Sequence, residues 1–484
     1  MSNNSSLAVG IDLGTTFSAV AYLDDLGRPV TLQNGEGDKV TPSVLLFEGN
    51  DVIVGKEAVK AFATDYAAIA ECAKRELGYR MFGKQLGGRQ YPPEALEAWI
   101  LNKLRMDAQA QIGQFDKVVV TVPAYFDEVR RKATQDAGYM AGFQVMDIIN
   151  EPTAAAVAFG FAQGFLKDDG TAPDEQTILV YDLGGGTFDV TVMRLQGSDF
   201  VALATDGDVR LGGRDWDQRL VDFVAEEFIR KFGIDPRDDA NAHGRLWREA
   251  EDAKRTLSAR NKCTLACDFQ GHAVRSEVTR EMFEDMTRDL LDRTAFTTRQ
   301  TLQAAGLEWS DVDHVLMVGG STRMPMVAQM LRELSGKEPN RSVSADEAVA
   351  HGAALHAGIL LSKGAGKESQ FRIKNVNSHS LGVVAVDVAT KRKRNAIVIP
   401  RNTPLPITAR RIFKTEKANQ RSILVQIVEG ESSSPDDCVQ LGKCSVRDLP
   451  KELPAQTPIE VRFKYEENGR LTVTVLVQGT DKAL

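Results

Sequence analysis

Two stretches of this sequence combine glycines with acidic residues in a way that suits a nucleotide. In residues 178–192 an apolar run ends at Asp182, glycines fill 184–186, Thr187 follows, and a second, alternating run contains Asp189. The pattern predicts a strand, a tight glycine turn and a second strand. Glycines let backbone N–H groups approach a phosphate chain, and carboxylates beside phosphate require a cation between them. We therefore expect a phosphate-binding hairpin whose acids hold Mg²⁺ largely through its water molecules.

The same order of residues occurs near the N-terminus. In residues 9–18 an apolar run leads to Asp12, Leu13 and Gly14, then to two threonines and Phe17. A single glycine hairpin is usually a plain turn, but two matching copies with matching acids favour a ligand site. Asp12 and Asp182 are 170 positions apart, which predicts a duplicated unit with two halves facing each other across a cleft.

Length and composition bound the class of protein. A chain of 484 residues with 43% hydrophobic content can bury a large core, and its length suggests roughly three domain-sized units. No apolar run approaches the ~20 residues needed to cross a membrane, and residues 1–6 lack the features of a signal peptide. The five cysteines are expected to be free thiols in a reducing cytoplasm. Cys263 and Cys267 have no further Cys or His to complete a zinc set.

Charge divides the chain into two chemically distinct parts. From residue 371 onward there are 19 basic and 12 acidic residues, a net charge of +7, whereas residues 1–370 carry 40 basic and 55 acidic residues, a net charge of −15. The contrast supports a boundary near 365–377. An acidic body argues against nucleic acid as the main partner.

Periodicity indicates alternating strands and helices first, and strands alone later. Expected helices cover 127–141, 151–158, 211–228, 251–258, a stretch from Met324 and a stretch from Asp346, and strands are expected at 118–122 and 315–318. After a flexible break at 362–367, period-two alternation predicts a compact antiparallel β region. Its expected strands are 383–388, 396–399, 423–428, 459–465 and 471–477. The basic run 391–394 is expected to be a solvated hairpin tip.

With these residues assembled, the chain resembles the DnaK-type (seventy-kilodalton) heat-shock chaperone family, within the actin and sugar-kinase superfamily of ATPases. The resemblance covers essentially all 484 residues, and its most specific stretches are 11–16, 122–126, 149–155, 182–187, 253–258 and 319–323. It implies an α/β fold, with a two-lobed actin-like ATPase domain of duplicated halves over 1–367 and an interdomain linker over 368–377. An antiparallel β-sandwich that binds substrate is implied over 378–484, without a helical lid.

The resemblance assigns roles to matching positions of the N-terminal region. Catalysis is assigned to Lys74, Glu151, Thr187 and Asp182, and the metal and its water shell to Asp12, Asp182 and Asp189. The phosphate side of the cofactor site comprises Gly14, Thr15, Thr16, Phe17, Gly184, Gly185 and Gly186. The adenosine side comprises Glu251, Lys254, Arg255, Ser258, Gly319, Gly320, Ser321, Arg323 and Asp346. From the sequence alone, Lys74 would be an ordinary surface lysine and the 251–258 stripe a solvated helix face.

The C-terminal region matches the family at positions that line a groove for extended apolar peptide. These positions are Val383, Val386, Phe413, Ile423 and Val425. A strand edge gives main-chain hydrogen bonds to such a peptide and an apolar pocket accepts one side chain. The alternative is that the five residues are simply β core. Pro123 and Arg131 match a relay between the nucleotide cleft and the peptide-binding part.

The implied function is an ATP-hydrolysing molecular chaperone that binds extended apolar segments of unfolded polypeptides. Its implied cofactors are ATP or ADP with Mg²⁺, and K⁺ is a further candidate. Implied partners are a J-domain cochaperone and a nucleotide-exchange factor, with no nucleic acid, no membrane and a cytoplasmic location. Two alternatives stay open: a nucleotide-binding peptide scaffold with little turnover, and a small-molecule kinase of the same superfamily.

Four features depart from the family pattern. The segment between Lys74 and Val118 is short, and 194–199 replaces the acidic loop expected for docking a J-domain. The chain ends just after the last expected strand, where a helical lid would follow. The linker has become basic, because Phe371 and Ile373 alternate with two cationic residues. Strand addition needs only backbone groups, so we expect this linker still to dock on the acidic ATPase half, assisted by charge.

Overall fold

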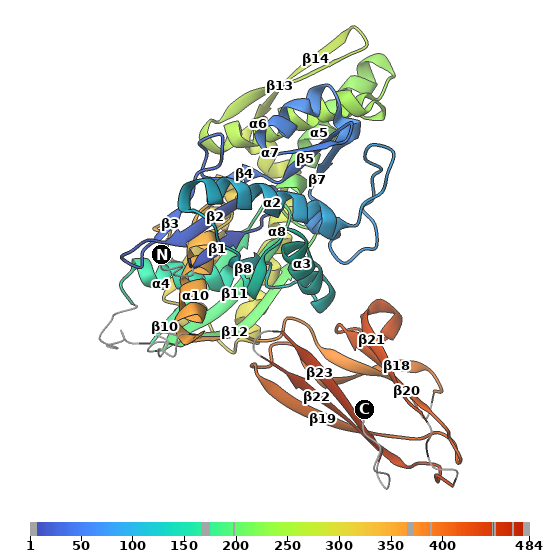
Figure 1. Cartoon of the computed structure of the whole chain (residues 1–484). Coiled ribbons are helices and arrows are strands. Elements are labelled where there is room, and N and C mark those ends of the chain that lie inside the picture. The colour runs from blue at the N-terminus through green and yellow to red at the C-terminus, as the bar shows by residue number, and fades with distance from the viewer. Residues whose placement is uncertain are drawn as a thin grey trace.

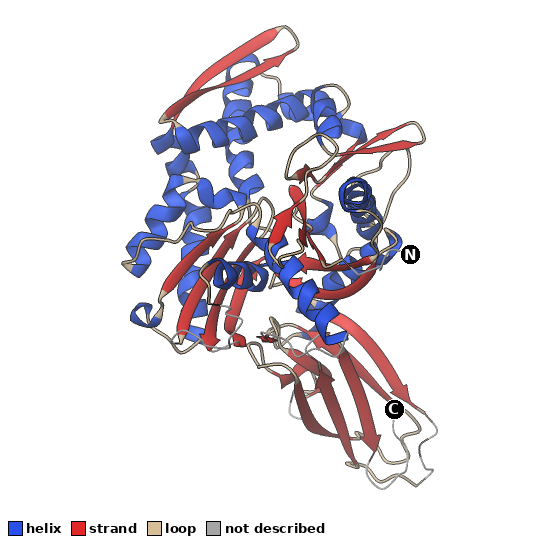
Figure 2. Ribbon diagram, turned by 60° about the vertical axis from the view of Figure 1, so that its left-hand side comes forward, coloured by secondary structure: helices blue, strands red, loops and turns tan. Residues whose placement is uncertain are grey.

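The computed structural model describes residues 7–165, 175–196, 199–364, 372–387, 390–447, 449, 452–466 and 469–477. It is a mixed α/β structure with several sheets (Figures 1 and 2). Residues 7–364, the N-terminal part, contain all the α-helices of the described chain, and the residues from 375 to 477, the C-terminal β part, are mostly strands. Within the described residues, no helix is both long and apolar enough to span a membrane.

The first large sheet has the strand order β3-β2-β1-β8-β9, with β4 (Thr41–Pro42) paired to β2. Its strands are β1 (Val9–Asp12), β2 (Phe17–Leu23), β3 (Pro29–Thr31), β8 (Lys117–Val122) and β9 (Gln144–Asn150). β1 pairs antiparallel with β2 and parallel with β8. The predicted strand, glycine turn and strand at 9–18 is therefore confirmed.

The second large sheet has the order β15-β10-β11-β12-β16. Its strands are β10 (Gln176–Leu183), β11 (Phe188–Gln196), β12 (Asp199–Asp208), β15 (His314–Val318) and β16 (Arg372–Lys374). β10 pairs antiparallel with β11 and parallel with β15, which repeats the arrangement of β1 with β2 and β8. The shared plan agrees with the predicted duplicated unit.

Helices cover these sheets, and two short sheets lie outside them. The helices are α1 (Lys56–Lys60), α2 (Pro93–Ile112), α3 (Glu128–Met140), α4 (Glu151–Ala162), α5 (Gly213–Phe232), α6 (Ala240–Ala259), α7 (Arg280–Met286), α8 (Arg288–Ala304), α9 (Pro325–Ser335) and α10 (Ala348–Gly364). The short sheets are β6-β5-β7 (Asp51–Val54, Val44–Glu48, Ile69–Glu71) and the hairpin β13 (Lys262–Phe269) and β14 (His272–Thr279). Both views place this hairpin at the end of the molecule opposite the C-terminal β part (Figures 1 and 2).

Small residues let two helices approach closely between the large sheets. A Cβ added at Gly352 of α10 would overlap the backbone of Ala154 in α4. The alanines that follow Ala154 are fully buried as well, so the small-residue stretch predicted to be a tightly packed helix has that role. The same packing holds Glu151, at the start of α4, inside the protein.

The linker adds a strand to the second large sheet, as the sequence predicted. β16 runs parallel to β12, with Ile373 opposite Phe200. Ile373 is partly buried against the apolar cluster that contains Phe200, and Lys374 Nζ lies 2.6 Å from Asp199 Oδ2. Phe371, the other apolar residue of the expected docking face, lies outside the described residues.

The C-terminal β part consists of two antiparallel sheets that share one apolar core. The four-stranded sheet has the order β18-β17-β20-β21 and the three-stranded sheet has the order β19-β22-β23. The strands are β17 (Leu381–Val386), β18 (Lys393–Ile399), β19 (Ile407–Lys414), β20 (Ile423–Glu429), β21 (Val439–Val446), β22 (Pro458–Tyr465) and β23 (Leu471–Val477). Strands β19 and β21 were not predicted from the sequence. In β19, basic residues interrupt the alternation of apolar and polar side chains. Strand β21 contains Gly442 and few apolar residues.

The two parts meet at the loop after β8. Ser378 donates a hydrogen bond to the carbonyl oxygen of Ala124, and a ring nitrogen of His379 lies 3.0 Å from the carbonyl oxygen of Tyr125. The backbone N–H of Glu128 donates to Glu429 Oε2 at 3.0 Å. This loop directly follows the strand that pairs with β1, so it connects the interior of the N-terminal part to the C-terminal β part.

Candidate functional site

A cavity of about 430 Å³ lies where the two glycine hairpins meet. It collects residues from five of the six most specific stretches of the sequence, namely 11–16, 149–155, 182–187, 253–258 and 319–323, but none from 122–126. All four predicted catalytic residues line it, namely Lys74, Glu151, Asp182 and Thr187. Of the other predicted residues, it is lined by Asp12, Gly14, Thr15, Thr16, Phe17, Gly184, Gly185, Glu251, Lys254, Arg255, Ser258, Gly319, Gly320, Ser321, Arg323 and Asp346.

Two predicted residues do not line the cavity. Asp189 is buried behind it, and its Oδ1 accepts a hydrogen bond from the backbone N–H of Tyr125 at 2.8 Å. The carbonyl oxygen of Gly186 faces Arg75, whose Nε donates to it at 2.7 Å. Arg75 also pairs with Asp215 at 2.5 Å, so this arginine connects the second hairpin to the start of α5.

The two hairpins pack directly against each other. A Cβ added at Gly185 would overlap the side chain of Thr16, and one added at Gly186 would overlap Thr15. Only glycine therefore fits these positions in this conformation, since any side chain would separate the hairpins. The residues predicted to surround the phosphates, Thr15 and Thr16 in the first hairpin and Gly185 and Gly186 in the second, therefore lie in close contact.

Lys74 is a buried residue at the base of the cavity and not a surface lysine. Its side chain is 1% exposed, and Nζ lies 2.5 Å from both Glu151 Oε1 and the carbonyl oxygen of Leu13. Burial works against the charged ammonium, but the carboxylates of Glu151 and Asp12 outweigh it and raise the pKa of Lys74. The lysine is therefore a fixed cation beside both hairpins.

Buried carboxylates gather near this lysine. Burial, reinforced by the charge of Glu151, raises the pKa of Asp12 to about 7 and the pKa of Asp189 to about 8, and it holds the pKa of Asp182 well above its usual value. Like charges held together in a dry site resist ionisation unless a cation joins them. The donor set therefore fits a hydrated divalent cation.

No group of three or more His, Cys, Asp or Glu side chains among the described residues is arranged to ligate a metal directly. Of the three predicted metal residues, Asp12 and Asp182 face the cavity, and Asp189 supports the site from behind.

The helix α6 forms the opposite wall. Arg255 Nη2 lies 2.6 Å from Glu251 Oε1, and its guanidinium carbon lies 5.5 Å from the centre of the Phe17 ring. Lys254 is held in place by Asp217 at 2.8 Å and by the carbonyl oxygen of Gly213 at 2.9 Å. The polar stripe of α6 thus faces a cavity, which corrects its interpretation as a solvated helix face.

A second ion pair closes the rim of the same wall. Arg323 Nη2 lies 2.6 Å from Asp346 Oδ2, and Ser321 Oγ donates to the carbonyl oxygen of Gly184 at 2.8 Å. Gly319 has a φ of 83° and Gly320 begins a short 3-10 helix. The strand β15 and the two glycines that follow it therefore lead into a helical turn and not into a second strand.

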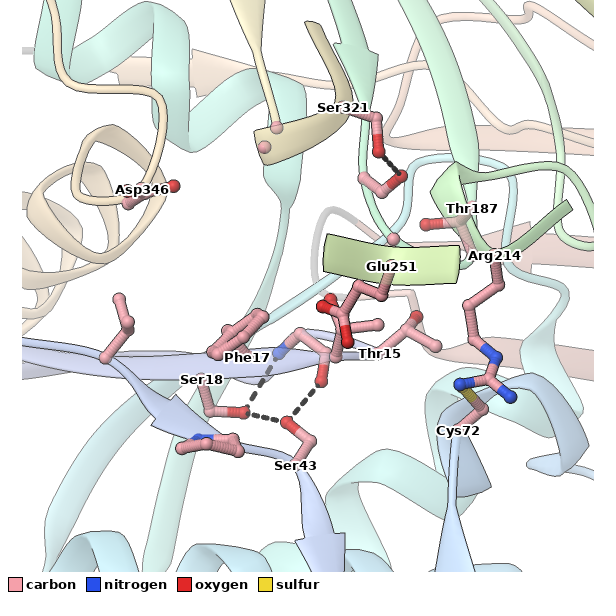
Figure 3. Close-up of a pocket in the computed structure, with 18 of the residues that line it drawn as sticks. Thr15, Phe17, Ser18, Ser43, Cys72, Thr187, Arg214, Glu251, Ser321 and Asp346 are labelled. Atoms are coloured by element: carbon pink, nitrogen blue, oxygen red, sulfur yellow. Dashed lines mark hydrogen bonds between the residues drawn. The ribbon is translucent and has the colours of Figure 1, made fainter. Parts of the chain in front are cut away.

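Sequence reasoning missed two sets of cavity residues, which Figure 3 shows. Ser18 Oγ accepts from the backbone N–H of Gly14 at 3.1 Å and lies 2.9 Å from Ser43 Oγ, which donates to the carbonyl oxygen of Gly14 at 2.8 Å. These bonds hold the first hairpin in shape. No signal in the sequence marks Ser43, because it lies between β4 and β5, far along the chain from the hairpin.

The other missed residues are Cys72 and Arg214. Arg214 pairs with Glu71 at 2.5 Å and 2.9 Å, and its guanidinium carbon lies 3.9 Å from the centre of the Trp247 ring. Burial raises the pKa of the Cys72 thiol to about 11, so this thiol is a poor nucleophile. Arg214 directly follows Gly212 and Gly213. This pair of glycines is the sequence feature that could have marked Arg214 as a candidate.

The five predicted peptide-binding residues separate into two environments. Val383, Ile423 and Val425 are buried in the core of the C-terminal β part, Phe413 is partly buried against the same core, and Val386 is 51% exposed. β17 and β20 are paired from Leu381 to Val383. No pairing of these two strands is present beyond Val383 in the described residues, so their remaining lengths separate.

Comparisons with known proteins agree with this site. A sequence model of the family described as Hsp70 protein matches residues 8–86 and 81–483. The chaperone protein DnaK of Halobacterium salinarum is 39% identical over 483 residues, covering 98% of this chain and 74% of the relative. The DnaK proteins of Thermus thermophilus (39% over 509 residues, 98% of this chain and 79% of the relative) and Thermotoga neapolitana (37% over 493 residues, 100% and 80%) are similar as well.

The family match spans nearly the whole chain. Members of this family bind and hydrolyse ATP. The chain belongs to the Hsp70 family and is an ATP-dependent chaperone with ATPase activity.

Proposed function

We propose that the cavity binds MgATP and MgADP between the two hairpins, and that hydrolysis there controls the binding of extended polypeptide by the C-terminal β part. The observation that carries this proposal is the placement of Lys74 and Glu151 beside both hairpins. The proposal includes a two-lobed actin-like ATPase domain over 1–367, a linker over 368–377 and a β-sandwich substrate domain over 378–484.

Each residue of the base has a distinct role in this proposal. Lys74 places a positive charge where an attacking water meets the γ-phosphate, and Glu151 orients that lysine and can accept a proton from the water. Thr187 donates its hydroxyl to the phosphates from the second hairpin. A bound cation would neutralise charge that develops on the phosphates, and Asp12 and Asp182 would hold its waters, with Asp189 supporting them from behind.

The rest of the cavity would hold the nucleoside. Backbone groups of the two hairpins, from Gly14 to Phe17 and from Gly184 to Gly186, lie where a phosphate chain would pass. The adenosine would lie between α6 and the turn that starts at Gly319. The ion pairs Arg255–Glu251 and Arg323–Asp346 support this placement, since each fixes a long side chain at the rim.

The separation of β17 and β20 supports a peptide site. Beyond Val383 the two strands leave backbone groups facing each other, and an extended segment placed there could hydrogen-bond to an open strand edge. Val386 and Phe413 would contact its apolar side chains, while Val383, Ile423 and Val425 would form the floor. Unfolded polypeptide is therefore the proposed substrate.

Further parts of the proposal concern the cell. We place the chain in the cytoplasm, with a J-domain cochaperone and a nucleotide-exchange factor as candidate partners, and K⁺ as a candidate second ion at the phosphates. The last residue of β11, Gln196, and the first residue of β12, Asp199, both belong to the atypical segment 194–199 that a J-domain would meet.

A single-turnover assay tests the function. Enzyme in excess is mixed with radiolabelled MgATP, with and without a permanently unfolded polypeptide, and free phosphate is measured. Free phosphate that appears faster with the polypeptide is the expected result. Phosphate found on a small-molecule hydroxyl would favour a kinase, and bound ATP without turnover would favour a scaffold.

A further inference from the structure

Basic residues are concentrated in the segment that surrounds the proposed peptide site. Between residues 383 and 425 there are ten Lys and Arg residues and only two acids, Asp387 and Glu416. The charge of the whole chain is −8, so this segment opposes the general trend. A concentration of one sign on one region steers partners of the other sign toward it.

The topology brings several of these cations to one end of the C-terminal β part, whereas Arg401 lies at the other end, where it pairs with Asp206 of the N-terminal part at 2.6 Å. β17 and β20 are antiparallel, so the end of β17 and the start of β20 lie at the same end of the sheet. Lys391 and Arg392 lie between β17 and β18, and Arg421 precedes β20. Lys414 is the last residue of β19, which leads into the same region. The opposite end, near Glu429, contacts the N-terminal part.

Most of these cations are exposed and lack an acidic partner. Arg394 pairs with Asp387 at 3.3 Å and Arg410 with Glu460 at 3.5 Å. The exposed residues for which the described part of the chain offers no ion pair are Lys391, Arg392, Lys393, Arg411, Lys414, Lys417 and Arg421, although Arg411 donates a hydrogen bond to the carbonyl oxygen of Ile397 at 2.6 Å. Their charge is therefore available to a ligand.

Apolar side chains lie among the same cations. Val386 is 51% exposed and stands opposite Lys393 across the β17–β18 ladder. Leu424, in β20 of the same sheet, is 57% exposed. The four-stranded sheet thus carries exposed apolar side chains, and unpaired cations follow its strand β17 and precede its strand β20.

We infer that this chain selects extended segments whose apolar core is flanked by acidic residues. The inference rests on the proposed peptide-binding function and specifies its substrate class. The N-terminal part repels such a segment, because residues 1–370 carry −15, while the separated ends of β17 and β20 attract it. Exposed charges act over about 10 Å at 0.1 M salt, so several unpaired cations act together on both flanks.

The test uses the full chain with ADP and three fluorescent peptides that share one apolar core. Their flanks are glutamate, serine or lysine. At about 0.05 M salt the glutamate-flanked peptide is expected to bind about tenfold more tightly than the lysine-flanked one, and the difference should nearly vanish at about 0.5 M salt. Equal affinities at low salt would overturn the inference while leaving peptide binding intact. Failure of all three to bind would overturn the proposed function too.

A charge-reversed variant shows whether these residues are responsible. Lys393→Glu/Arg421→Glu should remove the preference, whereas Arg260→Glu/Arg299→Glu, which reverses two exposed cations of the N-terminal part, should keep it. A preference unchanged in the first variant would contradict the inference. A labelled single-stranded oligonucleotide provides the last arm. If it bound more tightly than the glutamate-flanked peptide, and lost binding in the first variant, the basic end would belong to nucleic acid.

Discussion

Lys374 Nζ lies 2.6 Å from Asp199 Oδ2, and this ion pair joins the linker strand β16 to the edge strand β12. The two side chains are 46% and 25% exposed, so the pair itself contributes at most about 1 kcal/mol. Backbone pairing and the burial of Ile373 must supply the rest of the docking energy. The ion pair between Lys374 and Asp199 therefore assists docking but does not cause it.

The linker can be tested through the release of bound peptide. ATP is expected to speed release in the wild type, and the effect should shrink with salt as the exposed pair is screened. Ile373→Asp should abolish the effect, because a charge would enter the apolar cluster around Phe200. Lys374→Ala is the milder control and should weaken coupling only severalfold. Peptide off-rates by stopped flow decide the matter, and equal rates with and without ATP would show that the two parts are not coupled.

MgATP should stabilise the N-terminal part against heat. A ligand that binds only the folded state stabilises it by about 4 kcal/mol at a thousandfold excess over Kd. Because Asp12, Asp182 and Asp189 resist ionisation together, ATP with EDTA should stabilise far less than MgATP. Differential scanning calorimetry measures both. An identical Tm under the two conditions would contradict the proposal that a cation binds with the nucleotide.

Lys74→Ala should slow hydrolysis by about a hundredfold, since one preorganised charge aimed at the transition state is typically worth about 3 kcal/mol. Single-turnover phosphate release gives the rate, and nucleotide affinity should change little. The substitution leaves Glu151 without its partner in a buried site, so unfolding must be measured alongside. Lys74→Ala/Glu151→Gln is the matched control, because it removes both charges. Wild-type hydrolysis by a folded Lys74→Ala protein would contradict the assigned role.

Contact between the two parts should weaken as pH rises. Burial, together with the nearby charge of Glu128, raises the pKa of Glu429 to about 8, and burial also raises the pKa of Glu128. A carboxyl group whose pKa is higher in the docked state takes up a proton on docking. Its contribution is complete below its usual pKa near 4.5 and is lost as pH rises toward 8.

Small-angle scattering between pH 6 and pH 9 can follow this change as a growing radius of gyration. His379 acts in the same direction, because its pKa is raised: burial opposes its charge, but Glu431 and Glu429 outweigh burial. Glu429→Gln keeps the acceptor for the backbone N–H of Glu128 and should flatten the pH response. A wild-type radius that is constant over this range would contradict the prediction.

The peptide site requires substitutions that spare the core. Ile423 is 6% exposed inside the C-terminal β part, so Ile423→Asp would bury an unpaired charge and unfold that part. Val386→Asp should instead leave the fold intact and reduce peptide affinity at least tenfold, because the side chain is half exposed. Fluorescence anisotropy with a circular-dichroism check separates the two effects. Unchanged affinity in Val386→Asp would place the site elsewhere.

Local patterns were the most predictable features. The hairpins around Gly14 and Gly185 follow from short runs whose alternation and glycines leave few options, and the docking of Ile373 follows from strand addition through the backbone. The second sheet of the C-terminal β part was harder. β19 lies at the edge of its sheet. Exposed edge strands favour charged residues, and β19 accordingly carries Arg410 and Arg411. These charges interrupt the apolar pattern by which a strand is predicted from sequence.

Long-range contacts were beyond prediction from residue types. Lys74 meets Glu151, which is 77 positions away, and no local pattern around either residue reveals their burial. The contact of Ser43 with Gly14, 29 positions away, could not be predicted for the same reason. The resemblance to a family supplied the role of Lys74, whereas the structure supplies its surroundings.

The docking of β16 has a consequence for behaviour at high concentration. β12 would be the outermost strand of its sheet without the linker, and an uncovered edge presents unpaired N–H and C=O groups that can pair with another molecule. Each release of the linker thus exposes a self-association surface on the chaperone. The time that the protein spends undocked should set its own tendency to aggregate.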